Sequence, residues 1–163
     1  MATPSPPPLT RSDRRNRLNR IGRIARQLGF EGEVEYCHVY SLAGGAQYGK
    51  GPKSEDDLLI VYAEAFERDA DPEDFSLTAI LAHERGHQLL ARHPRIAKQV
   101  AGRISGASEE ILASLLGAML CESEADRENL TFKAIAELTD HGESPDAAFK
   151  QLQKLRDLFE ALL

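Results

Sequence analysis

The sequence lacks several features that define special classes of protein. It contains no tryptophan, only 6% aromatic residues, and two cysteines, Cys37 and Cys121, which are too few for a disulfide framework. The apolar stretch at residues 111–121 is about half as long as a bilayer span requires. No apolar run follows the N-terminal arginines, so no secretory signal peptide is expected. These absences exclude membrane-spanning and disulfide-stapled classes and predict a single soluble, cytoplasmic domain.

What the sequence does contain is an uneven distribution of charge. The net charge is −6, yet residues 1–28 hold seven arginines and one acidic residue, so this segment carries +6 and the rest of the chain −12. Residues 1–9 are proline-rich and are expected to be a disordered tail, and residues 10–28 a basic helix. A solvated or self-docked arginine face is favoured over nucleic-acid or anionic-membrane contact, because no nucleic-acid motif is present.

Hydrophobic periodicity and turn residues predict an α+β fold that is mostly helical, with a small sheet of two or three strands. Strands are expected at residues 33–40 and 58–62. The helix that begins at Ser108, Glu109 and Glu110 is expected to run unbroken to Leu138. The other helices are expected over residues 10–28, 76–93, 95–104 and 144–162.

The segment ILAHERGHQLLARH, residues 80–93, places the pattern HExxH on a predicted helix. His83 and His87 are four residues apart, so both imidazoles lie on one side of the helix, where they can bind one tetrahedral Zn²⁺. Glu84 is rotated by about 100° from His83, close enough to act on a water at the metal without being a ligand. The pattern predicts metal-assisted hydrolysis; the alternative is that both histidines are ordinary surface or core residues.

Two acidic residues lie within the apolar stripe of the predicted helix 108–138. Glu122 and Asp126 share a face with Ile111 and Leu115 on a helical wheel. A buried carboxylate is strongly destabilising unless a cation compensates it. A zinc ion would do so, with Glu122 as the third ligand and Asp126 accepting a hydrogen bond from a ligand histidine.

A second ligand set is compatible with the histidine spacing alone. His93 follows His87 by six residues, as in the metzincin pattern HExxHxxGxxH, but Leu90 stands where that pattern has glycine. On an unbroken helix His93 lies about 9 Å along the axis from His87. Glu122 is therefore favoured as the third ligand, and a metzincin-type site with His93 is the alternative.

The two segments together resemble the gluzincin zinc metallopeptidases. The HExxH helix and residues 122–155, which begin ESEAD, are similar to the family that contains the CAAX prenyl proteases and the bacterial heat-shock membrane proteases. The resemblance covers residues 57–155, although Glu128 and Asn129 replace the Leu-Gly pair usual in that family. Without a membrane helix, the chain resembles a minimal soluble member, similar to the minigluzincins.

The resemblance implies a zincin-like fold in which residues 29–163 form the metallopeptidase domain. Glu84 would be the catalytic residue and Asp126 would lie behind the metal ligands. An edge strand that pairs with an extended peptide would lie within residues 58–66. The implied ligands of the single zinc ion are His83, His87 and Glu122.

The sequence thus predicts a zinc-dependent endopeptidase acting on peptides or unfolded protein segments. The alternative is a proteolytically silent, zinc-stabilised binding module. Stabilisation of the developing oxyanion needs a further donor, which neither the pattern nor the resemblance identifies. The candidates by residue type are His141, Tyr36, Tyr40 and Tyr48.

Overall fold

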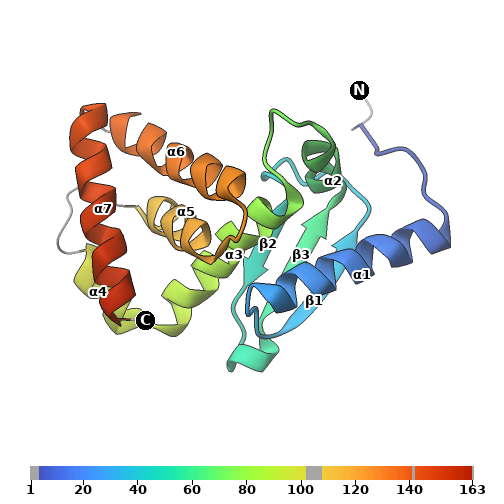
Figure 1. Cartoon of the computed structure of the whole chain (residues 1–163). Coiled ribbons are helices and arrows are strands. Elements are labelled where there is room, and N and C mark those ends of the chain that lie inside the picture. Colours follow the sequence, from blue (N-terminus) through green and yellow to red (C-terminus); the bar gives the residue numbers. More distant parts are fainter. Residues whose placement is uncertain (1–3, 102–107, 141, 163) are drawn as a thin grey trace.

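A computed structural model describes residues 4–101, 108–140 and 142–162 of the chain (Figure 1). The expected class is confirmed, because the fold is α+β and mostly helical with one small sheet. In chain order the elements are α1 (Arg11–Gln27), β1 (Glu33–Cys37), β2 (Ala46–Gly49), the 3₁₀ helix η1 (Ser54–Asp56), β3 (Leu58–Tyr62), α2 (Ala63–Ala70), α3 (Leu77–Arg92), α4 (Pro94–Ala101), α5 (Glu109–Leu120), α6 (Glu124–Asp140) and α7 (Pro145–Leu162).

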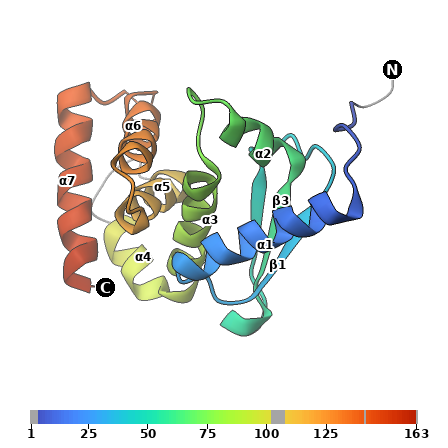
Figure 2. The same cartoon turned by 45° about the vertical axis from the view of Figure 1, so that its right-hand side comes forward.

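Helix α3 lies between two parts of the molecule that have separate cores (Figures 1 and 2). On one side its first half packs with α1 and the sheet, through residues such as Ile21, Leu59 and Leu81. On the other side its last turns pack with α5, α6 and α7, through residues such as Leu90 and Phe159. The helix that carries HExxH is therefore held from both sides.

The sheet has the order β1-β3-β2, with β3 parallel to β1 and antiparallel to β2. Strand β3 matches the predicted strand at residues 58–62 and is buried at Leu59 and Val61, as a central strand requires. The expectation of an edge strand within residues 58–66 is wrong, because β3 is central and residues 63–70 form α2. The edge strand next to α3 is β2.

The predicted continuous helix over residues 108–138 is also wrong. The chain forms α5 and α6 instead, separated by residues 121–123. Cys121 leaves α5 with an extended backbone (ψ 135°), and the hydroxyl of Ser123 accepts the backbone N–H of Asp126 at 3.4 Å, which caps the start of α6. Glu122 lies in this break and is exposed, so it does not share a buried helix face with Asp126.

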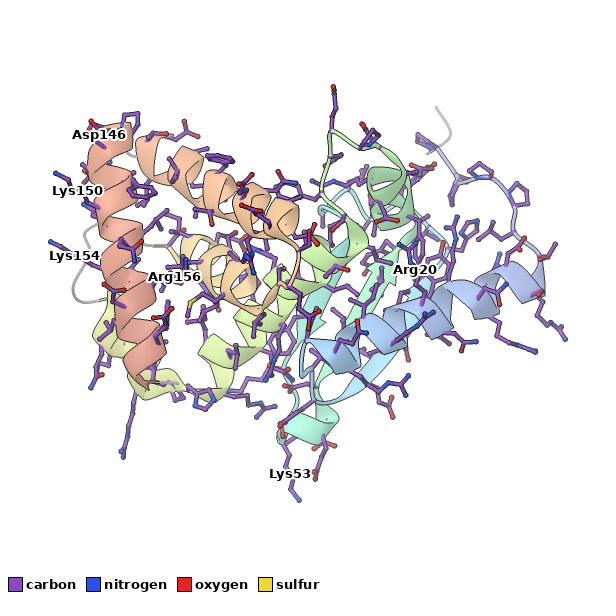
Figure 3. The ribbon with its side chains drawn as sticks, in the orientation of Figure 1. Arg20, Lys53, Asp146, Lys150, Lys154 and Arg156 are labelled. Atoms are coloured by element: carbon purple, nitrogen blue, oxygen red, sulfur yellow. The ribbon has the colours of Figure 1, made fainter. Side chains whose placement is uncertain are left out.

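The basic helix α1 belongs to the same core as the sheet. Its residues Ile21 and Ala25 are buried in the core that contains Leu59 of β3. Arg20 projects toward α2, where it forms a 2.8 Å ion pair with Asp69 (Figure 3). At least one arginine of the basic segment therefore docks on an acidic residue of the chain itself.

The buried carboxylate of Asp57 fastens α3 to the sheet. Asp57 is 1% exposed and accepts hydrogen bonds from Tyr48 Oη of β2 (2.9 Å), the N–H of Gly51 (2.8 Å) and Gln88 Nε2 of α3 (2.8 Å). Arg92, one turn further along α3, forms an ion pair with the same carboxylate. Burial raises the pKa of Asp57, but the hydrogen bonds, first from Arg92 and then from Gln88, outweigh it and hold the pKa well below its usual range.

Replacing Asp57 by asparagine should destabilise the fold by about 3 kcal/mol at pH 7, because Arg92 then loses its buried counter-charge. The pKa of Asp57 is lower in the folded than in the unfolded chain. Its contribution is therefore complete above about pH 5 and is lost as the pH falls below about 4. Urea unfolding of the wild type and of Asp57→Asn should converge on acidification.

Asp56→Asn is the matched control, because Asp56 is exposed and its carboxylate accepts one backbone N–H, from Lys53 at 3.3 Å. This variant should lose less than about 1 kcal/mol. Equal losses in the two variants at pH 7, or a constant difference between wild type and Asp57→Asn from pH 7 to pH 3, would contradict the role assigned to Asp57.

Candidate metal centre

The HExxH residues of α3 form a compact group of potential metal ligands. One ligand atom from each of His83, Glu84 and His87 lies within 4.8 Å of the others. The Nε2 atoms of the two histidines are 3.1 Å apart, and His83 is 7% exposed. The i, i+4 spacing therefore brings both imidazoles to one point, as predicted from the sequence.

A carboxylate from the first turn of α5 completes this group. Glu110 Oε2 lies 3.0 Å from His83 Nε2, and Glu110 Oε1 lies 3.0 Å from His87 Nε2. Glu109, its neighbour in the chain, approaches the other ring nitrogen of His87 at 3.5 Å. The sequence does not indicate Glu110 as a site residue, because a Ser108-Glu109-Glu110 run is typical of the start of a helix.

Ser114 lies behind the group, one turn after Glu110. It is fully buried, and its hydroxyl is 2.9 Å from Nδ1 of His83. When Nδ1–H donates to this hydroxyl, Nε2 of His83 presents its lone pair toward Glu110 and His87. Contacts of this kind orient metal-binding histidines and select the tautomer that can bind a metal.

Two glycines let α3 and α5 approach closely enough for these contacts. A Cβ atom on Gly86 of α3 would lie 2.2 Å from the carbonyl oxygen of Ala113, and one on Gly117 of α5 would lie 2.8 Å from the carbonyl of Ala82. Both contacts involve backbone, which cannot move aside as the end of a side chain can. The close approach sets the distance from Glu110 to the histidines.

Burial and neighbouring charges together set the protonation of His83, Glu84 and Glu110. Burial lowers the pKa of His83 to about 4, and the positive charge of Lys133 lowers it further. Burial also raises the pKa of Glu84 to about 7, against the opposing charge of His87. For Glu110, burial raises the pKa but the charges of His83, His87 and Lys133 outweigh it, so that the pKa is lowered. A neutral imidazole beside an ionised carboxylate is the form that binds metals.

A cavity of about 140 Å³ opens beside the group. His83, Glu84 and Glu110 form part of its wall, together with Ala46 of β2. Apolar side chains of α3, α6 and the loop before α3 form another part, and two cations also line the cavity. The apolar lining residues are Phe75, Ala79, Ile80 and Leu130, and the cations are Arg68 and Lys133.

The structure places the other predicted site residues away from this group. Glu122 is exposed and lines a different cavity, beside Ile24 and Leu28 of α1 and its C-cap. Asp126 is buried as expected, but its carboxylate accepts a 2.6 Å hydrogen bond from Ser76 at the start of α3, where a ligand histidine was expected.

The remaining candidates do not complete the site either. His93 is the exposed C-cap of α3, and His141 lies outside the described residues. The hydroxyls of the three candidate tyrosines are engaged by other groups. Tyr36 bonds to Arg17 and His38, Tyr40 donates to Glu67, and Tyr48 donates to Asp57.

Comparison of the chain with protein-family models, with curated proteins and with solved structures found no match. The likeness to gluzincins therefore depends on the motifs alone. Within the described residues, no helix has both the length and the apolar character needed to cross a bilayer.

The close approach of α3 and α5 makes a direct prediction. Gly86→Ala should destabilise the protein by about 2 kcal/mol, because the new methyl group meets the backbone of Ala113, and it should weaken metal binding by moving Glu110 away. Gly22→Ala is the control: a Cβ there has nothing within 4 Å, so this variant should gain up to about 1 kcal/mol from helix propensity.

Thermal and urea unfolding of both variants, with and without zinc, measure these changes. A Gly86→Ala protein as stable as the wild type would show that α3 and α5 are further apart than described.

Proposed function

We propose that this protein is a zinc-dependent endopeptidase with a zincin-like site, in which His83, His87 and Glu110 bind the ion and Glu84 acts on the attacking water. The observation that carries the proposal is the convergence of two imidazole nitrogens and a carboxylate at 3.0–3.1 Å, beside Glu84 on the wall of a cavity. Glu110 replaces Glu122 as the third ligand in this proposal.

The donor atoms fit Zn²⁺ in type, number and spacing. Two histidines and one glutamate are a known ligand set of catalytic zinc, which leaves a fourth position for water or substrate. Tetrahedral zinc with bonds of about 2.0–2.1 Å separates its ligands by about 3.3 Å, close to the observed 3.0–3.1 Å. When the proton of His83 is on Nδ1, facing Ser114, and that of His87 is on Nδ1, facing Glu109, three acceptor groups face one another, and a cation among them would stabilise that arrangement.

When bound, Zn²⁺ supplies Lewis-acid chemistry, since it polarises a carbonyl and acidifies a water. The chain's own residues then position and move the proton. Glu84 lies within 4.8 Å of both histidine ligand atoms, so its carboxylate can take a proton from the attacking water and deliver it to the leaving amine. Ser114 holds His83 in place throughout.

An extended peptide would bind along β2 in this proposal. Gly45 bonds to β3 through its carbonyl, so in an antiparallel pair the backbone groups of Ala46 and Tyr48 turn away from β3. The backbone N–H of Tyr48 donates to the Glu84 carboxylate, so Ala46 is the position at which an added strand would pair. Ala46 lines the cavity together with His83 and Glu84. An added strand would therefore pass over the site, in the manner of β-augmentation.

Removal of the third ligand distinguishes Glu110 from Glu122. Glu110→Gln should weaken zinc binding by on the order of 100-fold, because the carboxylate is lost from the site, whereas Glu122→Gln should leave the affinity unchanged. Competition with a chromophoric chelator measures both affinities. A loss of affinity in Glu122→Gln but not in Glu110→Gln would show that Glu122, and not Glu110, is the third ligand.

Glu84 tests the reaction separately from the metal. Glu84→Gln should bind one zinc ion with near wild-type affinity but lower the cleavage rate of denatured casein by about 10³-fold, because the proton acceptor is lost. Wild-type turnover should be abolished by a chelator and restored by zinc. Zinc binding without turnover in the wild type would favour the proteolytically silent, zinc-stabilised module.

A further inference from the structure

Lys133 of α6 lines the cavity next to the proposed metal group. Its side chain is half-buried, and its Nζ lies 5.9 Å from the centre of the Phe75 ring, on the apolar part of the wall. Leu130, one turn earlier on α6, is buried and lines the same cavity. The second and third turns of α6 thus bring one apolar side chain and one ammonium group to the cavity wall.

The second cation of the cavity is already neutralised. Arg68 pairs with Asp74 through Nε and Nη2, both at 3.0 Å, and its Nη1 donates to the carbonyl of Gly44 at 2.7 Å. Among the residues that the structure describes, Lys133 forms no ion pair within 4.0 Å. Lys133 is therefore the cation of this wall that has no carboxylate directly against it.

The charge balance of the site shows what Lys133 can bind. The cavity wall holds two carboxylates beside the histidines, from Glu84 and Glu110. Glu109 pairs with His87 at 3.5 Å, but it is 65% exposed and does not line the cavity. A divalent ion on His83, His87 and Glu110 would offset the two negative charges of the wall, and the positive charge of Lys133 would remain. In a half-buried, apolar setting, an uncompensated ammonium group attracts a carboxylate strongly.

We propose that Lys133 selects substrates with a carboxylate next to the bond that is cleaved. This inference rests on the proposed function, and it names the class of peptide that the site accepts. In an endopeptidase the carboxylate is that of an aspartate or glutamate side chain; a free C-terminal carboxylate in the same position would make the activity that of a carboxypeptidase. Phe75 and Leu130 would contact the aliphatic part of the same residue.

Paired peptides test this selection. Each pair differs only in the carboxylate: internal Glu against Gln in one pair, and a free C-terminal acid against its amide in the other. We compare kcat/KM for cleavage of the two members of each pair. We also compare, by calorimetry, their affinities for the zinc-loaded Glu84→Gln protein. The wild type should prefer the carboxylate member of at least one pair by roughly tenfold.

Variants of Lys133 separate its charge from its packing. Lys133→Met should abolish the preference, so that both members of a pair have about the same kcat/KM. Lys133→Arg should keep the preference, because only the positive charge is needed. Lys150→Met is the matched control, since Lys150 projects outward from α7 into solvent (Figure 3) and should keep the full preference. Zinc affinity should stay within about twofold of the wild type in Lys133→Arg and Lys150→Met, and Lys133→Met should bind zinc no more weakly than the wild type, because it loses a positive charge near His83 and Glu110.

The outcomes distinguish this inference from the proposed function. If all peptides are cleaved equally well, Lys133 does not select a carboxylate. The same conclusion holds if the preference for a carboxylate persists in Lys133→Met. Both results overturn the role of Lys133 and leave the proposed peptidase activity intact. Binding of the acidic peptides that depends on Lys133, without cleavage of any peptide, supports the carboxylate site and overturns the peptidase. An equal loss for both members of each pair in Lys133→Met would show a merely structural role.

Discussion

The backbone-to-backbone contact between α3 and α5 is the constraint on which the proposed site depends. Gly86 meets Ala113 and Gly117 meets Ala82 at distances that leave no room for a side chain. Because helices normally pack 8–10 Å apart depending on the side chains between them, two glycines at the contact allow an unusually close approach. Only with this approach do Glu110 and Ser114 reach the two histidines of α3.

The opposite side of α3 is fixed by polar contacts to Asp57 and to the end of α1. Gln88 and Arg92 bond to the buried Asp57, and Arg85 donates to the carbonyl of Leu28 at 3.2 Å. The histidines therefore lie on a helix that is fixed to the sheet by hydrogen bonds and to α5 by close packing. Such fixed supports hold a metal site in its binding geometry without rearrangement.

The sequence was informative where one helix alone determines the geometry. The spacing of His83 and His87 predicted that their imidazoles would lie together, and the apolar neighbours of Asp126 predicted its burial; both agree with the structure. The class of fold and the strand at residues 58–62 were likewise predictable from composition and periodicity.

The proposed third ligand, Glu110, was not predictable in the same way, because its position beside the histidines depends on how two helices pack. Glu110 and Ser114 have the same i, i+4 spacing as Glu122 and Asp126, so spacing does not tell the pairs apart. The assumption of one continuous helix then placed Glu122 on a buried face. The Ser123 cap, followed by Glu124 and Asp126 in the first turn of α6, was the local signal of a break.

Strand β2 was also not predictable from its own residues. The glycines around residues 44–51 indicated turns, and the four-residue strand between them is stabilised by its pairing with β3. A short edge strand of this kind is defined by its neighbour in the sheet more than by its own residues. Its position beside α3 is nevertheless what brings Ala46 to the cavity.

The proposed ligand set is tested by a crystal structure of the zinc-loaded protein, with anomalous scattering measured on both sides of the zinc absorption edge. We expect one strong anomalous peak about 2 Å from Nε2 of His83, Nε2 of His87 and the carboxylate of Glu110, with Glu84 beside the ion but not bound to it. A peak coordinated by Glu122 or His93, or no ordered zinc at the histidines, would contradict it.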